Sequence, residues 1–309
     1  MSQIEPSKGL HEKSRGCRYL IGGQSLAAPA LPAALHLVAT PIGNLSDITI
    51  RALEVLAAAD IIACEDTRTS RVLLQRYGIT GKLVAYHEHN AASAGPRLIE
   101  AIGDGQSVAL ISDAGTPLLS DPGYRLVDEA VQAGITVVPI PGPSAALAAL
   151  TASGLPTDAF FFAGFLPPKL KARADRLVEL REIPGSLVFY ESPRRLPESL
   201  AAMSQALGKT RKACVGRELT KAFEEFRRGT LAELAAHYEE AGAPKGECVV
   251  CVGPPLPEAA IEGEALDELL RELAEALPTG KAAAEAARRT GRAKNDLYRR
   301  IVEMKNRDG

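Results

Sequence analysis

The sequence predicts an α/β protein with two α/β domains and a small helical C-terminal tail. Three observations lead to this prediction. Short β-rich runs alternate with helical patterns from Leu35 onward, a second such series begins after Gly154, and the composition changes after Gly253. This alternation is typical of mostly parallel sheets covered by helices on both faces. We expect an unstructured extension at residues 1–34, α/β domains at 35–154 and 155–253, and a linker with a helical tail at 254–309.

The first domain is predicted from apolar runs and from the residues that interrupt them. Strands are expected at residues 35–39, 61–64, 83–86, 108–111 and 135–138. The first helix should present Ile50, Leu53 and Leu56 on one face, because these residues recur at helical spacing. Further helices are expected near Arg71, Leu98 and Val127. The glycines placed to end helices are Gly78, Gly103, Gly134 and Gly154.

The second domain repeats this pattern with longer amphipathic helices. Strands are expected at residues 159–163, 186–190, 213–215 and 248–252, and helices near Leu177, Leu200 and Leu234. The domains should meet near residues 154–157. The crevice between two such domains is the usual place for a small ligand.

The tail reverses its charge along its length. Residues 258–277 carry seven acidic residues and one Arg, whereas residues 281–309 carry nine Lys or Arg against four acids. Two short helices around Thr290-Gly291, with Leu297, Tyr298 and Ile301 packing between them, predict a helix-turn-helix that binds nucleic acid. A solvated basic helical hairpin is the alternative.

Composition excludes several classes of protein. The formal net charge is only −2, so nucleic acid must be bound by a local patch. Apolar runs are too short for a membrane span, and five scattered cysteines favour reduced thiols and a cytoplasmic location. Cys248 and Cys251 should point to opposite faces of one strand, so we expect no metal site there. His87 and His89 should share a face of a strand, where RNA contact is favoured over metal binding.

Three loops follow predicted strands of the first domain, at residues 40–45, 112–123 and 141–145. Each contains Gly or Pro with Ser, Thr, Asp or Asn, and none has the spacing of a dinucleotide or nucleoside triphosphate loop. Each alone could be a capped turn. Because the ends of parallel strands meet at one sheet edge, the three together predict a binding site.

The residue motifs of these loops, and their order along the chain, resemble those of the tetrapyrrole-methylase superfamily. Within it, they are similar to the ribosomal RNA branch, the small-subunit rRNA cytidine-2′-O-methyltransferases. The matching segments are Leu37–Leu45 with Asp47–Thr49, Glu65–Arg68, Ser112–Gly123, Pro141–Ala145, Gly164–Pro167 and Tyr190–Pro193. The resemblance covers residues 35–253, the helical tail is also similar, and residues 1–34 lie outside it.

The resemblance implies S-adenosylmethionine as cofactor, bound in the cleft between the two domains, and it implies a homodimer. The residues that match the family's cofactor loops are Pro41, Ser112, Asp113, Gly115, Thr116, Ser144, Ala145, Leu166 and Tyr190. Small residues there would let backbone groups approach the ligand closely, and Asp113 suits an amino or hydroxyl group.

The implied reaction is 2′-O-methylation of a cytidine ribose in the decoding region of 16S rRNA, within the small ribosomal subunit. A ribose hydroxyl is a weak acid, so a base or a cation that stabilises the alkoxide would help. The candidates are Asp66, Glu191, Glu65 and Glu218 as bases, and Arg68, Lys169, Arg194 and Arg217 as cations. The residues expected to contact RNA are His87, Arg194, Arg288, Arg289, Arg292, Lys294, Arg299 and Arg300.

Two other functions remain open from the sequence. The same fold could methylate carbon atoms of a precorrin-type tetrapyrrole, because fold alone does not decide the substrate. The chain could also be a ribosome-assembly factor that binds RNA without turnover. The loop at Glu65–Arg68 and the basic tail favour RNA as the substrate, and the intact cofactor loops favour an enzyme.

Overall fold

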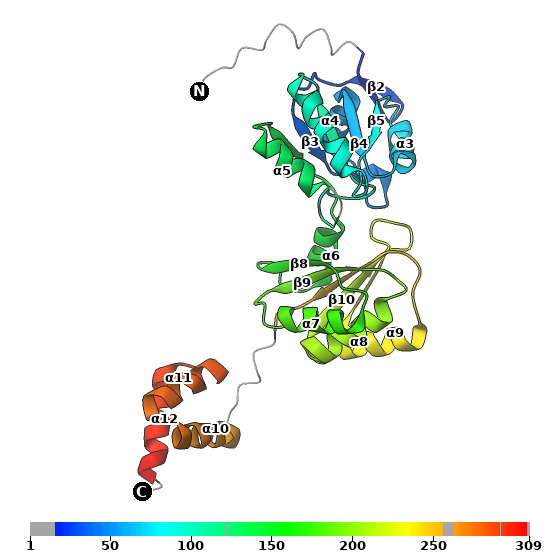
Figure 1. The fold of residues 1–309 in the computed structure, drawn as a ribbon. Helices are drawn as coiled ribbons and strands as arrows, with labels where there is room; N and C mark the ends of the chain where they lie inside the picture. Colours follow the sequence, from blue (N-terminus) through cyan, green and yellow to red (C-terminus); the bar gives the residue numbers. More distant parts are fainter. Residues whose placement is uncertain (1–15, 121–122, 256–262, 291, 308–309) are drawn as a thin grey trace. The chain divides into compact units, whose positions relative to one another are not determined.

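The computed structural model describes residues 16–120, 123–255, 263–290 and 292–307 (Figure 1). The chain divides into two compact units. We call residues 1–253 the α/β unit and residues 254–309 the helical unit.

The α/β unit contains a five-stranded sheet in which every pairing is parallel. Its strand order is β5-β4-β6-β3-β7, with bounds β3 Leu35–Val38, β4 Ile61–Cys64, β5 Leu83–Ala85, β6 Val108–Ile111 and β7 Val137–Ile140. The connecting helices are α2 Ile50–Ala58, α3 Thr67–Arg76, α4 Ala91–Gly103 and α5 Tyr124–Gln132. Apolar clusters cover both faces, one including Leu53 and Leu56 of α2 and the other including Leu98 of α4 and Leu126 of α5. This confirms the predicted parallel architecture.

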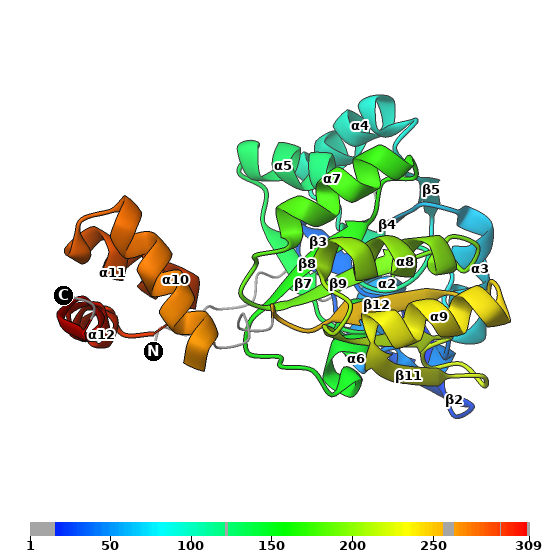
Figure 2. The same cartoon turned by 90° about the horizontal axis from the view of Figure 1, so that it is seen from below.

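A second five-stranded sheet in the same unit is mixed. Its order is β11-β10-β12-β9-β8, with bounds β8 Phe160–Phe165, β9 Ser186–Glu191, β10 Lys212–Arg217, β11 Glu225–Thr230 and β12 Cys248–Val252. Only β8 and β9 pair in parallel. Helices α7 Leu170–Leu180, α8 Leu196–Leu207 and α9 Leu231–Ala241 lie along one face (Figure 2). Helix α6 Ala145–Ser153 packs on the other face.

The position of α6 differs from the expected domain boundary. The sequence places residues 145–153 in the first domain, but Ala146, Ala149 and Leu150 pack against β9, β10 and β12 of the second sheet. Both sheets belong to one compact unit. The elements that belong with the first sheet therefore end before α6. Gly154, where the sequence places the domain boundary, lies among the elements that pack with the second sheet.

The N-terminal segment is more ordered than expected. Strands β1 Arg18–Ile21 and β2 Gln24–Ala27 form an antiparallel hairpin around Gly22-Gly23. Tyr19 is only 3% exposed and joins the core beside α2, and the Leu20 backbone N–H donates to the Tyr77 carbonyl at 2.7 Å. The expectation of an unstructured extension is wrong for this hairpin, and residues 1–15 lie outside the described residues.

Four local expectations for the first sheet are also wrong. Strand β7 begins at Val137, two residues later than predicted, and Ile50 is 60% exposed because it starts α2 outside the packed face. Gly103 is the last helical residue of α4; the left-handed position belongs to Gly105, with φ +88°. The prediction that His87 and His89 share one face of a strand is also wrong, because β5 ends at Ala85 and both histidines lie in the turn before α4.

The helical unit consists of α10 Gly263–Ala276, α11 Thr279–Thr290 and α12 Lys294–Arg307. Its core includes Leu270 of α10, Ala286 of α11, and Leu297 and Ile301 of α12. Tyr298, expected to pack with them, is 46% exposed. None of the helices among the described residues has the length and apolarity that crossing a membrane requires.

Candidate cofactor pocket and catalytic residues

The three loops expected to form a site meet at the carboxyl edge of the parallel sheet. Thr40 and Gly115 exchange two backbone hydrogen bonds, with N to O distances of 2.9 and 3.0 Å. The Thr116 hydroxyl donates to the Pro143 carbonyl at 3.1 Å, which ties the second loop to the third. Loops far apart in the sequence therefore form one connected surface.

Glycine is required at the centre of this surface. Gly115 has φ +82°, a conformation that side-chain-bearing residues rarely adopt, and an added Cβ would lie 3.2 Å from Ile42 Cγ2. At Gly142 an added Cβ would lie 2.9 Å from Ala39 Cβ. At both positions glycine therefore allows the loops to pack closely against their neighbours in the protein.

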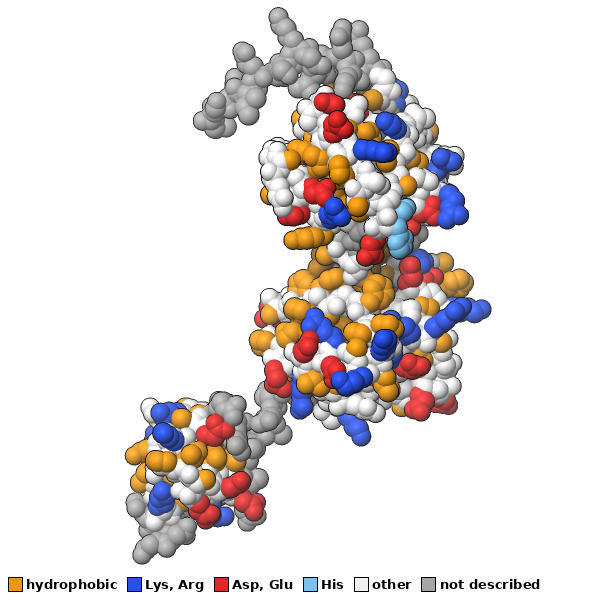
Figure 3. All heavy atoms as spheres, viewed as in Figure 1, with side chains coloured by type: hydrophobic (Ala, Val, Ile, Leu, Met, Phe, Trp, Pro, Cys, Tyr) orange, Lys and Arg blue, Asp and Glu red, His pale blue; other side chains and the backbone are white. Residues whose placement is uncertain are grey.

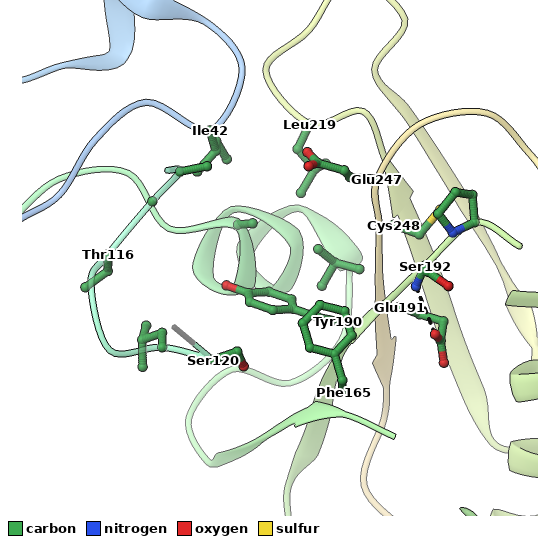
Figure 4. Close-up of a pocket in the computed structure, with 16 residues that line it drawn as sticks. Ile42, Thr116, Ser120, Phe165, Tyr190, Glu191, Ser192, Leu219, Glu247 and Cys248 are labelled. Atoms are coloured by element: carbon green, nitrogen blue, oxygen red, sulfur yellow. Dashed lines mark hydrogen bonds between the residues drawn. The ribbon is translucent and has the colours of Figure 1, made fainter. Parts of the chain in front are cut away.

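A cavity of about 330 Å³ opens beside Gly115 and is lined by both sheets (Figure 4). We call it the cofactor pocket. The residues that line it from the first sheet's loops and from α6 are Ile42, Ala114, Gly115, Thr116, Leu119, Ser120 and Ala145. The residues that line it from the second sheet and its loops are Phe165, Tyr190, Glu191, Ser192, Pro193, Leu219, Glu247, Cys248 and Val249. Its size lies in the range of small-molecule sites.

Aromatic rings form the second-sheet side of the pocket. The Tyr190 ring contacts Phe162 edge-on, with 4.9 Å between centroids, and Phe165 at 5.6 Å. In Figure 4 the rings of Tyr190 and Phe165 lie between Ser120 and the strand that carries Cys248. Such rings offer a flat apolar surface to a planar ligand.

The residues matched to the family's cofactor loops fall into three groups. Gly115, Thr116, Ala145 and Tyr190 line the cofactor pocket. Pro41, Ser112 and Asp113 line a neighbouring cavity of about 290 Å³ on the other side of the Thr40–Gly115 bridge. The remaining two do not line either cavity: the Ser144 side chain accepts the Leu147 N–H and caps α6, and Leu166 is 2% exposed in the core under α7 and α8.

The acidic segment after β4 lies beside the second of these loops. The Asp66 backbone N–H donates to Asp113 Oδ1 at 3.1 Å. Hydrogen bonds from Arg68 lower the pKa of Asp66 to about 2, and the pair is exposed to solvent. Burial, and then the Asp113 charge, raise the pKa of Glu65. Of these carboxylates, Glu65 therefore has the greater proton affinity.

Glu191 is placed where it cannot easily act as a base. Its side chain is fully buried and accepts hydrogen bonds from the Ser199 hydroxyl at 2.5 Å and the Ser192 N–H at 2.9 Å. Figure 4 shows its carboxylate turned away from the Tyr190 ring. Neighbouring residues on a strand point to opposite faces, so Glu191 faces away from Tyr190, and its burial depends on tertiary packing against α8.

A loop between β10 and β11 contributes residues that the sequence did not single out. We call residues 218–224 the strap. Leu219 lines the cofactor pocket, and Thr220 Oγ1 accepts the Asn44 N–H at 3.1 Å, so the strap contacts the first loop. Glu218 and Thr220 both have positive φ, and Lys221 donates to Glu218 at 2.7 Å and to Glu247 at 3.1 Å. The hydrogen bond from Lys221 to Glu218 lowers the pKa of Glu218, which makes this carboxylate a poor base.

The remaining predicted residues are spread over the surface. Lys169 and Arg194 are exposed, and Arg217 binds Glu225 at 3.0 Å rather than facing the pocket. His87 is half-buried in its turn. No group of three or more His, Cys, Asp or Glu suited to a metal occurs among the described residues. Cys248 and Cys251 belong to the apolar clusters on opposite faces of β12, as predicted.

In the helical unit, the basic residues differ in their surroundings. Arg300 binds Asp267 of α10 at 2.7 Å, so part of its charge is neutralised. Arg299 pairs with Asp296 but remains largely exposed, and Lys294 is exposed at the start of α12. Arg292 precedes that helix and is half-buried. Arg288 and Arg289 lie on α11, and their side chains are outside the described part of the structure.

Comparison with protein families supports this division of the chain. Residues 34–235 match the family described as Tetrapyrrole (Corrin/Porphyrin) Methylases. Residues 259–305 match the RsmI C-terminal HTH domain. Together the two matches cover both units.

A relative with high identity is the protein of Mesorhizobium japonicum named ribosomal RNA small subunit methyltransferase I. It is 64% identical over 290 residues, which are 94% of this chain and 98% of the relative. Among solved structures, diphthine synthase aligns with TM-score 0.57 and 18% identity, over 77% of this chain and 94% of that one. Uroporphyrin-III C-methyl transferase from Thermus thermophilus, complexed with S-adenyl homocysteine, aligns with TM-score 0.51 and 20% identity, over 71% and 97%.

Proposed function

Because the chain belongs to the tetrapyrrole methylases and, within them, to the ribosomal RNA small subunit methyltransferase I family, we propose its reaction. It transfers a methyl group from S-adenosylmethionine to the 2′-oxygen of a cytidine ribose in the decoding region of 16S rRNA. The observation that carries this proposal is 64% identity, over nearly the whole length of both chains, to a protein named for small-subunit rRNA methylation.

The cofactor pocket fits S-adenosylmethionine in size and chemistry. Gly115 lines the pocket with backbone alone, and the Thr116 and Ser120 hydroxyls can meet polar groups of the ligand. The Tyr190 and Phe165 rings provide an apolar wall for a planar base. The fold neighbour solved with S-adenyl homocysteine supports the same type of ligand. The cofactor would supply an activated methyl group on a sulfonium.

The chain's own residues would position the ribose and remove its proton. We assign Glu65 as the proton acceptor, because it follows β4 next to Asp66, whose N–H binds Asp113 of the second loop, and because Asp66, Glu191 and Glu218 are bonded to other groups. Burial, and then the Asp113 charge, raise the pKa of Glu65, which fits this role. A base works best when its pKa lies near the working pH. Arg68 follows Glu65 by three residues in the sequence. Its side chain is exposed and can contact the RNA backbone.

Tetrapyrrole methylation is the second candidate for this fold. The solved structures that carry such names share only 15 to 23% identity with this chain, which supports the fold alone. The match of the helical unit to an HTH domain favours RNA.

A homodimer would use the edge of the second sheet. Strand β8 lies at that edge, and its side chains Phe160, Phe161 and Phe165 are 46, 37 and 54% exposed. An open strand edge with exposed aromatic side chains favours association with a partner. Light scattering at micromolar concentration tests this, and a monomer mass would contradict it.

The test of the proposed reaction is methyl transfer in vitro. Small ribosomal subunits from a strain that lacks this protein are incubated with the purified chain and radiolabelled S-adenosylmethionine, and the rRNA is mapped by mass spectrometry. We expect one methylated cytidine ribose. Glu65→Gln should retain cofactor affinity and lose most of the transfer. Label in no RNA, or label in a porphyrinogen offered in parallel, would contradict the proposal.

A further inference from the structure

A third cavity, which has basic walls, lies at the end of β10, on the side covered by α9. Its volume is about 280 Å³. We call it the basic cavity. The residues that line it are Arg217, Glu225, Arg227, His237, Tyr238, Ala241, Gly242, Pro244 and Lys245. It does not share any lining residue with the cofactor pocket.

The basic cavity has more positive than negative charge. Glu225 is its one carboxylate, and both guanidinium groups bind it: Arg217 Nη2 at 3.0 Å and Arg227 Nη2 at 2.9 Å. Lys245 makes no ion pair with any residue described in the structure. Two arginines and one lysine therefore face a single acid, which leaves an excess of two positive charges before His237 is counted.

Two acids outside the lining reduce that excess by one charge. Glu218 and Glu247 both bind Lys221 of the strap, at 2.7 and 3.1 Å, and this lysine neutralises one of the two carboxylates. One positive charge of the excess therefore remains. The face in view in Figure 3 mixes charges of both signs. A local excess around a concave site is therefore a distinctive feature.

One donor of the basic cavity lacks an acceptor. Arg227 Nε is buried and has no hydrogen-bond partner among the residues that the structure describes. A buried donor without an acceptor is destabilising. Its neighbour Arg217 is held in place, because Nη1 donates to the Lys245 carbonyl at 3.1 Å. An anion with several oxygens would satisfy the unpaired donor and the excess charge at the same time.

The basic cavity lies next to the cofactor pocket along the chain and in the sheet. Arg217 is the last residue of β10 and pairs with Cys248, which lines the cofactor pocket. Lys245 precedes Cys248 by three residues, and Glu247 between them also lines the cofactor pocket. A polynucleotide could therefore cross this edge of the sheet with a phosphate at the basic cavity and a neighbouring sugar in the cofactor pocket.

We propose that the basic cavity binds a backbone phosphate of the substrate RNA, close to the nucleotide that is methylated. This inference rests on the proposed function for the identity of the polymer. Lys245 supplies a charge that no described residue pairs, and Arg227, which uses Nη2 for Glu225, can offer a further donor to a phosphate oxygen. The cavity gives the α/β unit an RNA contact of its own, separate from the helical unit.

The experiment measures binding of full-length protein to a fluorescent small-subunit rRNA fragment across a salt series. The variants are Lys245→Gln, Arg227→Gln, and Lys209→Gln as a control, since Lys209 is exposed and precedes β10 at its opposite end. Lys245→Gln changes an exposed side chain, so it should fold normally, and thermal unfolding checks Arg227→Gln. Cofactor affinity is measured for each variant.

We expect each of the first two variants to weaken RNA binding and to flatten the log–log salt slope by about 0.7–0.9. Lys209→Gln should leave the slope unchanged, and cofactor affinity should be unchanged in all three. Wild-type slopes in Lys245→Gln and a folded Arg227→Gln would overturn the proposal. If methylation by the wild-type protein persists in that case, the proposed function stands without the cavity. If the slopes fall but no rRNA is methylated, the cavity stands and the proposed function fails.

Discussion

The two sheets of the α/β unit present different kinds of surface to the cofactor pocket. The parallel sheet contributes loops held by backbone hydrogen bonds, with Gly115 in a conformation that excludes a side chain. The mixed sheet contributes side chains, among them Phe165, Tyr190 and Leu219. We therefore expect the backbone shape of the parallel sheet's loops to control whether the ligand enters the pocket. The side chains of the mixed sheet should control the affinity for the ligand.

The largest expected effect is on the parallel-sheet side. In Gly115→Leu, strain at φ +82° and a side chain directed among Ile42 and Pro143 should weaken S-adenosylmethionine binding by more than about 100-fold, equivalent to about 2.7 kcal/mol. Isothermal calorimetry measures this affinity.

Gly105→Leu provides a matched control for that prediction. Gly105 has φ +88°, but no atom lies within 4 Å of an added Cβ. We expect lower stability and unchanged affinity. Equal loss of affinity in both variants would mean that general strain, and not the pocket, explains the result.

A smaller effect is expected on the mixed-sheet side. Tyr190→Ala should weaken cofactor binding by about ten-fold, because the ring and its contacts with Phe162 and Phe165 contribute about 1.4 kcal/mol. Tyr190→Phe should keep most of the affinity, and Tyr124→Ala, at a side chain that is 77% exposed, should have no effect. Wild-type affinity for Tyr190→Ala would remove the mixed sheet from the account of binding.

The smallest effect concerns the strap and depends on pH. Bonding to Lys221 lowers the pKa of Glu218, so this pair stabilises the protein above the ordinary glutamate pKa of about 4.3 and loses its effect as the pH falls below that value. Lys221→Met should therefore reduce the free energy of unfolding by about 0.2–1 kcal/mol at pH 7. The difference from wild type should shrink towards pH 3 in denaturant titrations. A constant difference across this range would contradict the assignment.

The same contrast explains what the sequence could predict. The parallel sheet and its three loops were predictable, because buried strands are continuous apolar runs and their ends are marked by Gly and Pro. Strand β11 was missed, since Glu225, Arg227 and Arg228 leave it no apolar run. The β1–β2 hairpin was missed because only Tyr19 is well buried in it.

Within the site, the residues that belong to recognisable loop motifs could be predicted from the sequence. The residues whose role depends on burial could not. Gly115, Thr116, Ala145 and Tyr190, four of the residues that match the family's loops, line the cofactor pocket. Leu219 belongs to no recognisable sequence motif, and its position at the cofactor pocket follows only from the path of the strap. Glu191 belongs to a matching segment, but its burial is a tertiary property that a single sequence does not encode visibly.

Amide hydrogen exchange with and without S-adenosylhomocysteine tests most directly that both sheets hold the cofactor. Amides that a ligand covers or rigidifies exchange more slowly. The account predicts slower exchange at residues 114–116 of the parallel sheet's loop and also at residues 190–192 of the mixed sheet, with no change at residues 69–73 beside the neighbouring cavity. Protection confined to residues 69–73 and 111–113 would place the cofactor in the neighbouring cavity and contradict the account.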